Sequence, residues 1–260
     1  MPFRARFDCL WCGRAYATRA PDDIEGWASL CPDCLARAQE NGFLRSRLRT
    51  ALSERARAAP ASAGERDAWY LRQPPYSGGP LIDLPWQMEL DQATRWLDER
   101  PLSGVIVELA AGTGWWSPLL AGKGELWVYE EDPESLELAR GRLVAHGLMA
   151  HLHPRAPTAS AEREADVVFA AFLLGAAQGD ADRARRADAV RHWLRPGGTF
   201  AFVEAQPREG PGLVAGPSGP LRPATAAALE RVLAEVGLDA IAVSSTATAF
   251  LMGTATRSAT

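Results

Sequence analysis

The hydrophobic residues of the chain follow two periods that alternate along the sequence. From Glu89 onward, segments with apolar residues three or four positions apart alternate with short, continuous apolar runs. The first pattern is typical of helices that bury one face, and the second of buried strands. Strands that alternate with helices predict an α/β fold with a doubly wound, mostly parallel sheet. Predicted helices cover 89–99, 115–121, 133–146, 181–194 and 224–236, and predicted strands cover 104–109, 125–130, 148–153, 165–174 and 199–205.

The cysteines of the chain lie near its start, as two CxxC pairs. Cys9 and Cys12 form the first pair, and Cys31 and Cys34 form the second. This spacing is typical of a tetrahedral zinc site, in which each pair supplies two thiolates. Two disulfides or a redox couple are the alternatives. The first residues lack the apolar core of a signal peptide, which disfavours disulfides, and a redox couple needs no second pair. We predict one structural zinc ion bound by all four cysteines.

A helical pattern with Leu44, Leu48 and Leu52 on one face follows the second pair, which resembles a treble-clef zinc finger. This segment is rich in arginine, which could bind RNA or could simply be solvated. The chain as a whole has a net charge of -4 and a pI of about 5.7, which opposes the attraction of RNA. We therefore expect no RNA binding, although RNA remains the alternative partner. The arginines concerned are Arg37, Arg45, Arg47, Arg49, Arg55 and Arg57.

Composition divides the chain into three parts. A zinc-finger module is predicted over 1–58 and the alternating helices and strands over 89–260. Between them, 59–88 begins with small and polar residues that are typical of a linker. It continues with aromatic residues that could form a lid over a substrate or could pack as core, namely Trp69, Tyr70, Tyr76 and Trp86.

The overall composition narrows the class of protein. Hydrophobic residues make up 47% of the chain and charged residues 23%, which is ordinary for a globular protein. No apolar run approaches the roughly 18 residues that would indicate a membrane span. Together with the start of the sequence, this predicts a cytoplasmic protein with no membrane partner.

The most informative segment is VIVELAAGTGWW, in which a buried strand ends on Glu108 and small residues follow. In a doubly wound sheet, ligands bind at the carboxyl ends of the strands. The glycines fit a dinucleotide fingerprint poorly, and a carboxylate at that place would repel a pyrophosphate but attract an ammonium group. Glu130 ends the next strand, where a carboxylate can accept hydrogen bonds from both hydroxyls of a ribose. An ammonium group and a ribose without phosphates describe S-adenosylmethionine.

Four segments in this order and spacing resemble class I S-adenosylmethionine-dependent methyltransferases: ELAAGTG, VYEEDPESLELAR, DVVFAAFLLG and LRPGGTFAFVEA. The resemblance covers residues about 86–257. It implies a Rossmann-like sheet with a C-terminal antiparallel hairpin over 239–245 and 249–257. It also implies that S-adenosylmethionine is bound by Glu108, Ala110, Gly112, Gly114, Glu130, Glu131 and Phe172, with Ala110 where the family more often has glycine.

The methyl acceptor is less well defined by the sequence. No catalytic motif follows the fourth strand, so the catalytic residues are unknown, and methyl transfer requires alignment more than a general base. An acidic pI and the aromatic segment favour a small-molecule acceptor. A zinc module ahead of this fold instead resembles ribosomal RNA methyltransferases. A third interpretation is a non-catalytic binding protein in which the sheet is only a scaffold.

Overall fold

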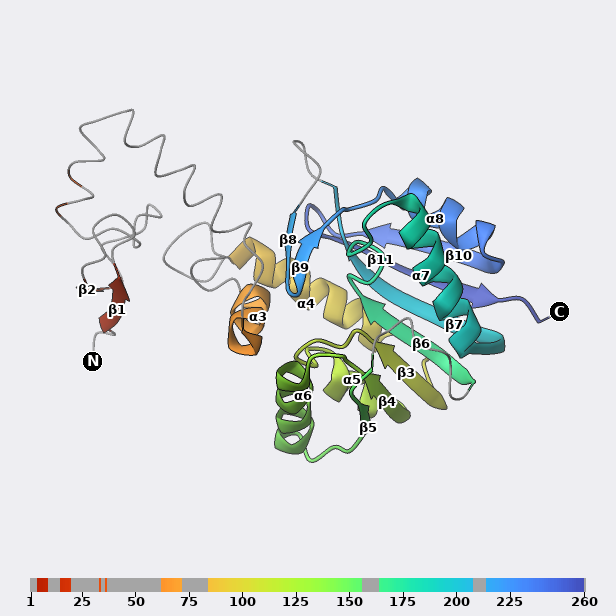
Figure 1. Cartoon of the computed structure of the whole chain (residues 1–260), viewed down its shortest axis with the longest axis horizontal. Helices are drawn as coiled ribbons and strands as arrows, with labels where there is room; N and C mark the ends of the chain where they lie inside the picture. Colours follow the sequence, from red (N-terminus) through yellow and green to blue (C-terminus); the bar gives the residue numbers. More distant parts are fainter. Residues whose placement is uncertain are drawn as a thin grey trace. The chain divides into compact units, whose positions relative to one another are not determined.

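The structure is a computed structural model that describes residues 4–8, 15–19, 33, 36, 62–71, 84–155, 164–207 and 214–259 (Figure 1). The chain forms two compact units. Unit 1 consists of Met1–Ala58 and Ala68–Gln87, and unit 2 consists of Ala59–Asp67 and Met88–Thr260. Each unit is described separately below.

Unit 2 is built on a seven-stranded sheet with the strand order β10-β11-β7-β6-β3-β4-β5. The strands from β3 to β7 pair in parallel, as predicted from the alternation of helices and strands. β11 is antiparallel to both β7 and β10, which confirms the expected C-terminal antiparallel hairpin. The strands are β3 (Val105–Leu109), β4 (Glu125–Tyr129), β5 (His151–His153), β6 (Ala165–Ala171), β7 (Leu194–Ala205), β10 (Leu238–Ser245) and β11 (Phe250–Arg257).

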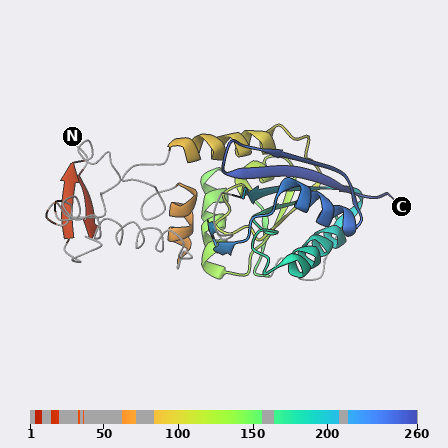
Figure 2. The same cartoon turned by 90° about the horizontal axis from the view of Figure 1, so that it is seen from above.

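Helices cover both faces of this sheet. Figure 2 shows α7 and α8 on one side of the strands and α4 on the other. α6 begins where its sequence predicts, because Asp132 caps it by accepting a hydrogen bond from the Ser135 amide, and Pro133 occupies the first turn. The helices are α3 (Ala63–Tyr70), α4 (Leu84–Asp98), α5 (Ser117–Ala121), α6 (Pro133–Ala145), α7 (Asp180–Trp193) and α8 (Ala226–Glu235).

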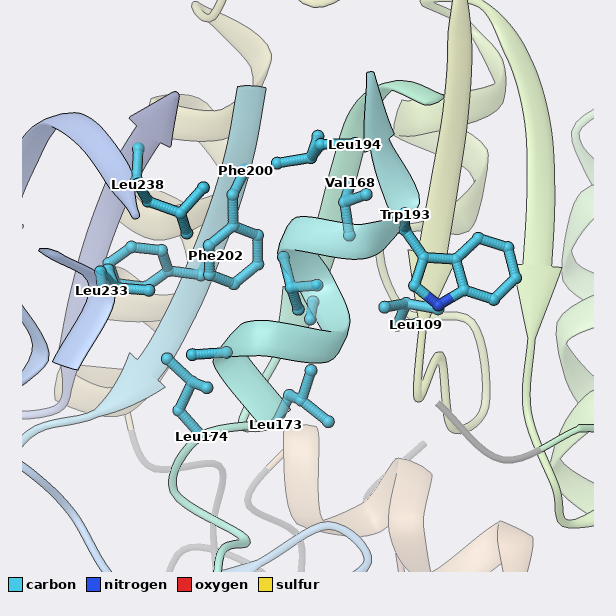
Figure 3. Close-up of a cluster of buried hydrophobic side chains, with 14 of the residues drawn as sticks. Leu109, Val168, Leu173, Leu174, Trp193, Leu194, Phe200, Phe202, Leu233 and Leu238 are labelled. Carbon is cyan, nitrogen blue, oxygen red and sulfur yellow. The ribbon is translucent and has the colours of Figure 1, made fainter. Parts of the chain in front are cut away.

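The hydrophobic core of unit 2 lies between the sheet and the helices α7 and α8 (Figure 3). Phe200 and Phe202 of β7 point into it, with their ring centroids 5.2 Å apart. Trp193 closes the end of α7 and packs against Tyr129 of β4 at 4.7 Å. Burial of these large side chains anchors the sheet, since each fully buried aromatic residue contributes roughly 1.5–3 kcal/mol.

Several elements differ from the prediction in extent. β7 begins at Leu194, which lies opposite Ala165, and its pairing with β6 is irregular until Thr199, which lies opposite Val167. β6 ends at Ala171, since Phe172 adopts a left-handed backbone conformation with φ of 60°. A short antiparallel hairpin, β8 (Val214–Gly216) with β9 (Gly219–Leu221), was not predicted. The segment that forms β8 and β9 carries too little apolar periodicity to be recognised in the sequence.

In unit 1, two strands flank the first cysteine pair. β1 (Arg4–Asp8) and β2 (Ala15–Arg19) pair antiparallel, with Asp8 opposite Ala15. In the sequence, Cys9 and Cys12 come between these two strands. All four cysteines lie outside the described residues, as does the Arg37–Arg57 segment.

The aromatic residues of the predicted lid segment pack against one another in unit 1. The Trp69 ring lies edge-on to Tyr70 at 5.1 Å and to Trp86 at 5.2 Å. Trp86 Nε1 donates a hydrogen bond to the Tyr70 carbonyl at 2.8 Å. These contacts are those of packed core residues, while Tyr76 lies outside the described residues.

α4 is held to the C-terminal hairpin by a buried carboxylate. Glu89 accepts hydrogen bonds from the amides of Thr248 and Ala249, at 2.9 Å and 2.6 Å, and from the Thr248 hydroxyl at 2.7 Å. The Thr246 hydroxyl donates a further bond to it. Burial alone would raise the pKa of Glu89, but the hydrogen bonds outweigh it and hold the pKa below its usual range. The ionised form of Glu89 therefore stabilises unit 2.

In the described parts of the chain, no helix is both long and apolar enough to cross a membrane.

We expect Glu89→Ala to lower the free energy of unfolding by at least about 2 kcal/mol at pH 7, because it leaves buried amides without an acceptor. Since the pKa of Glu89 is lowered by folding, its contribution is present above about pH 4.5 and is lost as the pH falls below that value. Denaturant unfolding at pH 7 and pH 4 would measure both effects. Asp91→Ala, at an exposed position of the same helix, serves as the control, and an equal loss in both variants would contradict the assignment.

Candidate active site

The site lies where the order of strands reverses. β3 and β6 are neighbours in the sheet, but the chain proceeds from β3 outward to β4 and β5 before it returns to β6. Such a switch point leaves room for a ligand beyond the carboxyl ends of the two strands. Ala110 follows β3 and Phe172 follows β6, and both have positive φ, of 53° and 60°. The chain therefore leaves the extended conformation directly after both strands.

Glu108 is the second-to-last residue of β3 and lies at this edge. Its side chain is 2% exposed, and the Ser117 hydroxyl donates a hydrogen bond to it at 2.5 Å. Burial raises the pKa of Glu108 to about 8, the Ser117 bond opposes that rise, and the nearby Glu130 carboxylate adds to it. A buried carboxyl with a raised pKa favours a cation as its ligand, because a positive charge would stabilise the ionised form.

Glu130 joins the end of β4 to the glycine loop. One of its oxygens accepts a hydrogen bond from the Gly112 amide at 2.7 Å, and the other accepts one from the Asp132 amide at 2.9 Å. Burial raises the pKa of Glu130 despite these two bonds. Each carboxylate oxygen has two lone pairs, so Glu130 retains acceptor capacity for the hydroxyls of a ligand.

The glycine loop uses its two glycines differently. Both have positive φ, 56° at Gly112 and 73° at Gly114. A Cβ at Gly114 would lie 2.6 Å from the Cβ of Ala139, so Gly114 lets the loop pack on α6. A Cβ at Gly112 would meet open space. Thr113 lies between them, and its buried hydroxyl has no hydrogen-bond partner among the described residues.

The two remaining predicted residues lie at opposite sides of this edge. Phe172 is buried, and its ring lies 6.2 Å from both Trp116 and Phe250. A left-handed conformation is strained for a bulky residue and costs roughly 1–3 kcal/mol, which the surrounding structure must offset. Glu131 is exposed beside Glu130. Glu108, Ala110, Gly112, Gly114, Glu130, Glu131 and Phe172 therefore all lie along the carboxyl edge of β3, β4 and β6.

A third carboxylate lies at this edge and was not predicted as a site residue from the sequence. Glu204, near the end of β7, accepts hydrogen bonds from the amides of Leu174 and Gly175 at 2.7 Å and 2.9 Å. It is 2% exposed, and burial raises its pKa to about 7, against the effect of these bonds and of Arg183. Glu204 thereby fixes the loop that begins at Phe172. Its signal was visible in the sequence, since VEA places an acid at the end of an apolar strand just as VEL does.

His153, which flanks the site in the sequence, is engaged elsewhere. Its ring stacks on Trp127 at 5.1 Å and on Tyr129 at 4.8 Å. Its carbonyl accepts a hydrogen bond from the Glu130 amide at 3.2 Å. His153 thus supports the end of β4 through its backbone.

Comparison with known proteins identifies the fold. No protein-family model matches the sequence, and no curated protein sequence matches it. Among solved structures, the DhpI–SAH complex has a TM-score of 0.57 and 22% sequence identity, over 76% of this chain and 95% of DhpI. An S-adenosylmethionine-dependent methyltransferase from Clostridium acetobutylicum has a TM-score of 0.55 and 14% identity, over 75% of this chain and 97% of that one. The chain has the methyltransferase fold.

The methyltransferase fold is also that of the [4+2]-cyclase SpnF, which has a TM-score of 0.57 and 17% identity over 78% of this chain and 98% of SpnF. A shared fold does not fix the reaction, which depends on the residues of the site.

The residues at the switch point of this methyltransferase fold suit S-adenosylmethionine. A Cβ at Gly112 would meet open space, the Thr113 hydroxyl has no hydrogen-bond partner among the described residues, and the Glu108 and Glu130 carboxyls are buried nearby. These are groups that a cationic ligand with hydroxyls could use. Among the residues that the structure describes, no group of His, Cys, Asp and Glu side chains could hold a metal ion. The predicted zinc ligands are not among those residues.

We expect Gly114→Ala to destabilise the protein by roughly 1–3 kcal/mol, because the added Cβ would overlap Ala139 and the backbone conformation is left-handed. Gly141→Ala on α6 is the matched control. A Cβ at Gly141 meets open space, so this change should stabilise the helix by about 0.4–1 kcal/mol. Chemical denaturation of both variants would measure the difference, and equal stabilities would show that the loop does not pack as described.

Proposed function

We propose that the protein is an S-adenosylmethionine-dependent methyltransferase that transfers a methyl group to a small-molecule acceptor. The observation that carries the proposal is the pair of buried carboxyls, Glu108 and Glu130, on either side of the glycine loop at the switch point. Glu108 would bind the ammonium group, and Glu130 would accept hydrogen bonds from the ribose. When bound, S-adenosylmethionine supplies an activated methyl group.

The contribution of the protein to the reaction would be alignment. Methyl transfer from a sulfonium is a direct displacement, so the acceptor atom must lie in line with the breaking bond. Phe172 stands at the end of β6, and Glu204 fixes the loop that carries it. We infer that Phe172 faces the reacting centre and that Glu204 holds it in place through the Leu174 and Gly175 amides.

A small molecule is favoured as the acceptor by two observations. DhpI, which shares the fold at 22% identity, has been solved as a DhpI–SAM–HEP complex. The net charge of -4 opposes the attraction of a polyanion such as RNA. Ribosomal RNA is the alternative acceptor, and a non-catalytic binding protein is the alternative class, since a shared fold does not fix the function.

The test is binding of S-adenosylmethionine and S-adenosylhomocysteine to the purified protein, measured by calorimetry. We expect Glu130→Ala to weaken binding at least about tenfold, because charged hydrogen bonds contribute roughly 1.5–3 kcal/mol each. Glu137→Ala, at an exposed position of α6, is the control and should bind as the wild type does.

Absence of binding by the wild type would refute the proposal, and unchanged binding by Glu130→Ala would refute the role of Glu130. If the protein binds the cofactor, incubation with radiolabelled S-adenosylmethionine and either a metabolite extract or ribosomal RNA would separate the two acceptor classes.

We also propose that Cys9, Cys12, Cys31 and Cys34 bind one structural zinc ion. In support, the first pair falls between β1 and β2, which are paired strands, and such a connection can form a zinc knuckle. Four thiolates complete a tetrahedral site, so the ion would stabilise unit 1 without taking part in the reaction. A reducing, cytoplasmic environment would keep the thiolates available.

Elemental analysis of the purified protein should find about one zinc ion per chain. Cys31→Ser should lose the metal and unfold the N-terminal module, because metal binding and folding are coupled in small zinc modules. The free energy of unfolding of unit 2 should not change in this variant. A finding of two disulfides without zinc would contradict this proposal.

A further inference from the structure

One face of α6 connects the glycine loop to the short helix α3. Four residues of α6, from its N-cap to its last turn, are spaced so that they share one face: Asp132, Ser135, Ala139 and Arg142. Ala139 lies against Gly114, and the Arg142 Nε donates a hydrogen bond to the Thr113 carbonyl at 3.3 Å. The glycine loop is therefore supported along this face of α6.

Two charged residues of α3 contact the same face of α6. Arg66 donates hydrogen bonds to Asp132 and Ser135. Asp67 accepts a hydrogen bond from Arg142 Nη2 at 2.7 Å. All of these residues belong to unit 2, although α3 itself continues beyond Asp67.

Arg142 is the residue on which these contacts converge. Its guanidinium contacts the Asp67 carboxylate and the Thr113 carbonyl, and it lies over the Trp115 ring with its Cζ 5.1 Å from the ring centroid. The planar guanidinium presents several donors in fixed directions, so one pair with Asp67 orients the donor that reaches Thr113. Both side chains of the pair are about a quarter exposed, at 24% and 29%, so solvent screens it only in part.

The loop that Arg142 contacts needs such support. Thr113 stands between two glycines with positive φ, and glycine leaves the backbone more freedom than any other residue. A loop that binds a ligand through its backbone binds more tightly when its conformation is fixed beforehand. Two side chains from outside the loop hold it, Glu130 at the Gly112 amide and Arg142 at the Thr113 carbonyl.

We propose that Asp67 and Arg142 are positioning residues for the cofactor, which set the glycine loop by linking it to α3. The link also works in reverse, because coupling between two sites is reciprocal: a bound cofactor that orders the loop stabilises α3 against the body of unit 2. The inference rests on the proposed function, since it takes S-adenosylmethionine as the ligand of the loop.

The experiment measures the dissociation constant of S-adenosylhomocysteine for the unmodified protein and four variants. Arg142→Ala should weaken binding about tenfold, and Asp67→Ala, which leaves α6 intact, should weaken it at least threefold. Arg140→Ala is the matched control, because Arg140 is an exposed arginine on the same helix that pairs with Glu137. The double variant Asp67→Ala/Arg142→Ala should bind as weakly as Arg142→Ala, since the two residues act through one contact.

A second measurement separates positioning from general stability. Amide hydrogen exchange in residues 64–67 should slow when S-adenosylhomocysteine is added to the wild type or to Arg140→Ala, and should not change in Asp67→Ala. Binding within twofold of the wild type in both Arg142→Ala and Asp67→Ala would overturn the inference and leave the proposed function intact. Absence of binding by the wild type would overturn both.

Discussion

Three glutamates that must be buried at the ends of strands organise this edge of the sheet. Burial of a carboxyl is unfavourable unless donors satisfy it, and each of the three finds its donors in a neighbouring loop. Glu108 takes the Ser117 hydroxyl at the start of α5, Glu130 takes an amide of the glycine loop, and Glu204 takes two amides of the loop after β6. The acids therefore fix the loops, and the loops in turn hold the acids away from water.

The same requirement accounts for the small residues around the acids. The Glu204 carboxylate can approach the loop after β6 because Gly175 has no side chain, since a Cβ there would lie 2.8 Å from the carboxylate oxygen. Gly114 serves the glycine loop in the same way by giving it access to α6. Ala110 and Phe172 also adopt left-handed conformations, although neither is a glycine. Backbone strain is therefore concentrated at the switch point, and the surrounding hydrogen bonds must offset its cost.

Much of this arrangement could be predicted from the sequence, because it depends on local patterns. The periods of apolar residues gave the alternation of helices and strands, and acids at the ends of apolar strands gave Glu108 and Glu130. The roles of Glu204, Asp67 and Arg142 could not be predicted, because they depend on contacts between residues far apart in the chain. α3 lies in the segment that composition marked as a linker, and the charged contacts of Arg66 and Asp67 with α6 explain how a polar segment becomes an ordered helix.

The raised pKa of Glu108 affects how readily the site binds a proton. Because burial raises its pKa to about 8, this carboxyl takes up a proton more readily than an exposed glutamate does. A cation that binds beside it favours the ionised form, so the proton must leave for solvent when the ligand arrives. Binding of a cationic ligand and release of the proton are therefore coupled, so the affinity for such a ligand depends on pH.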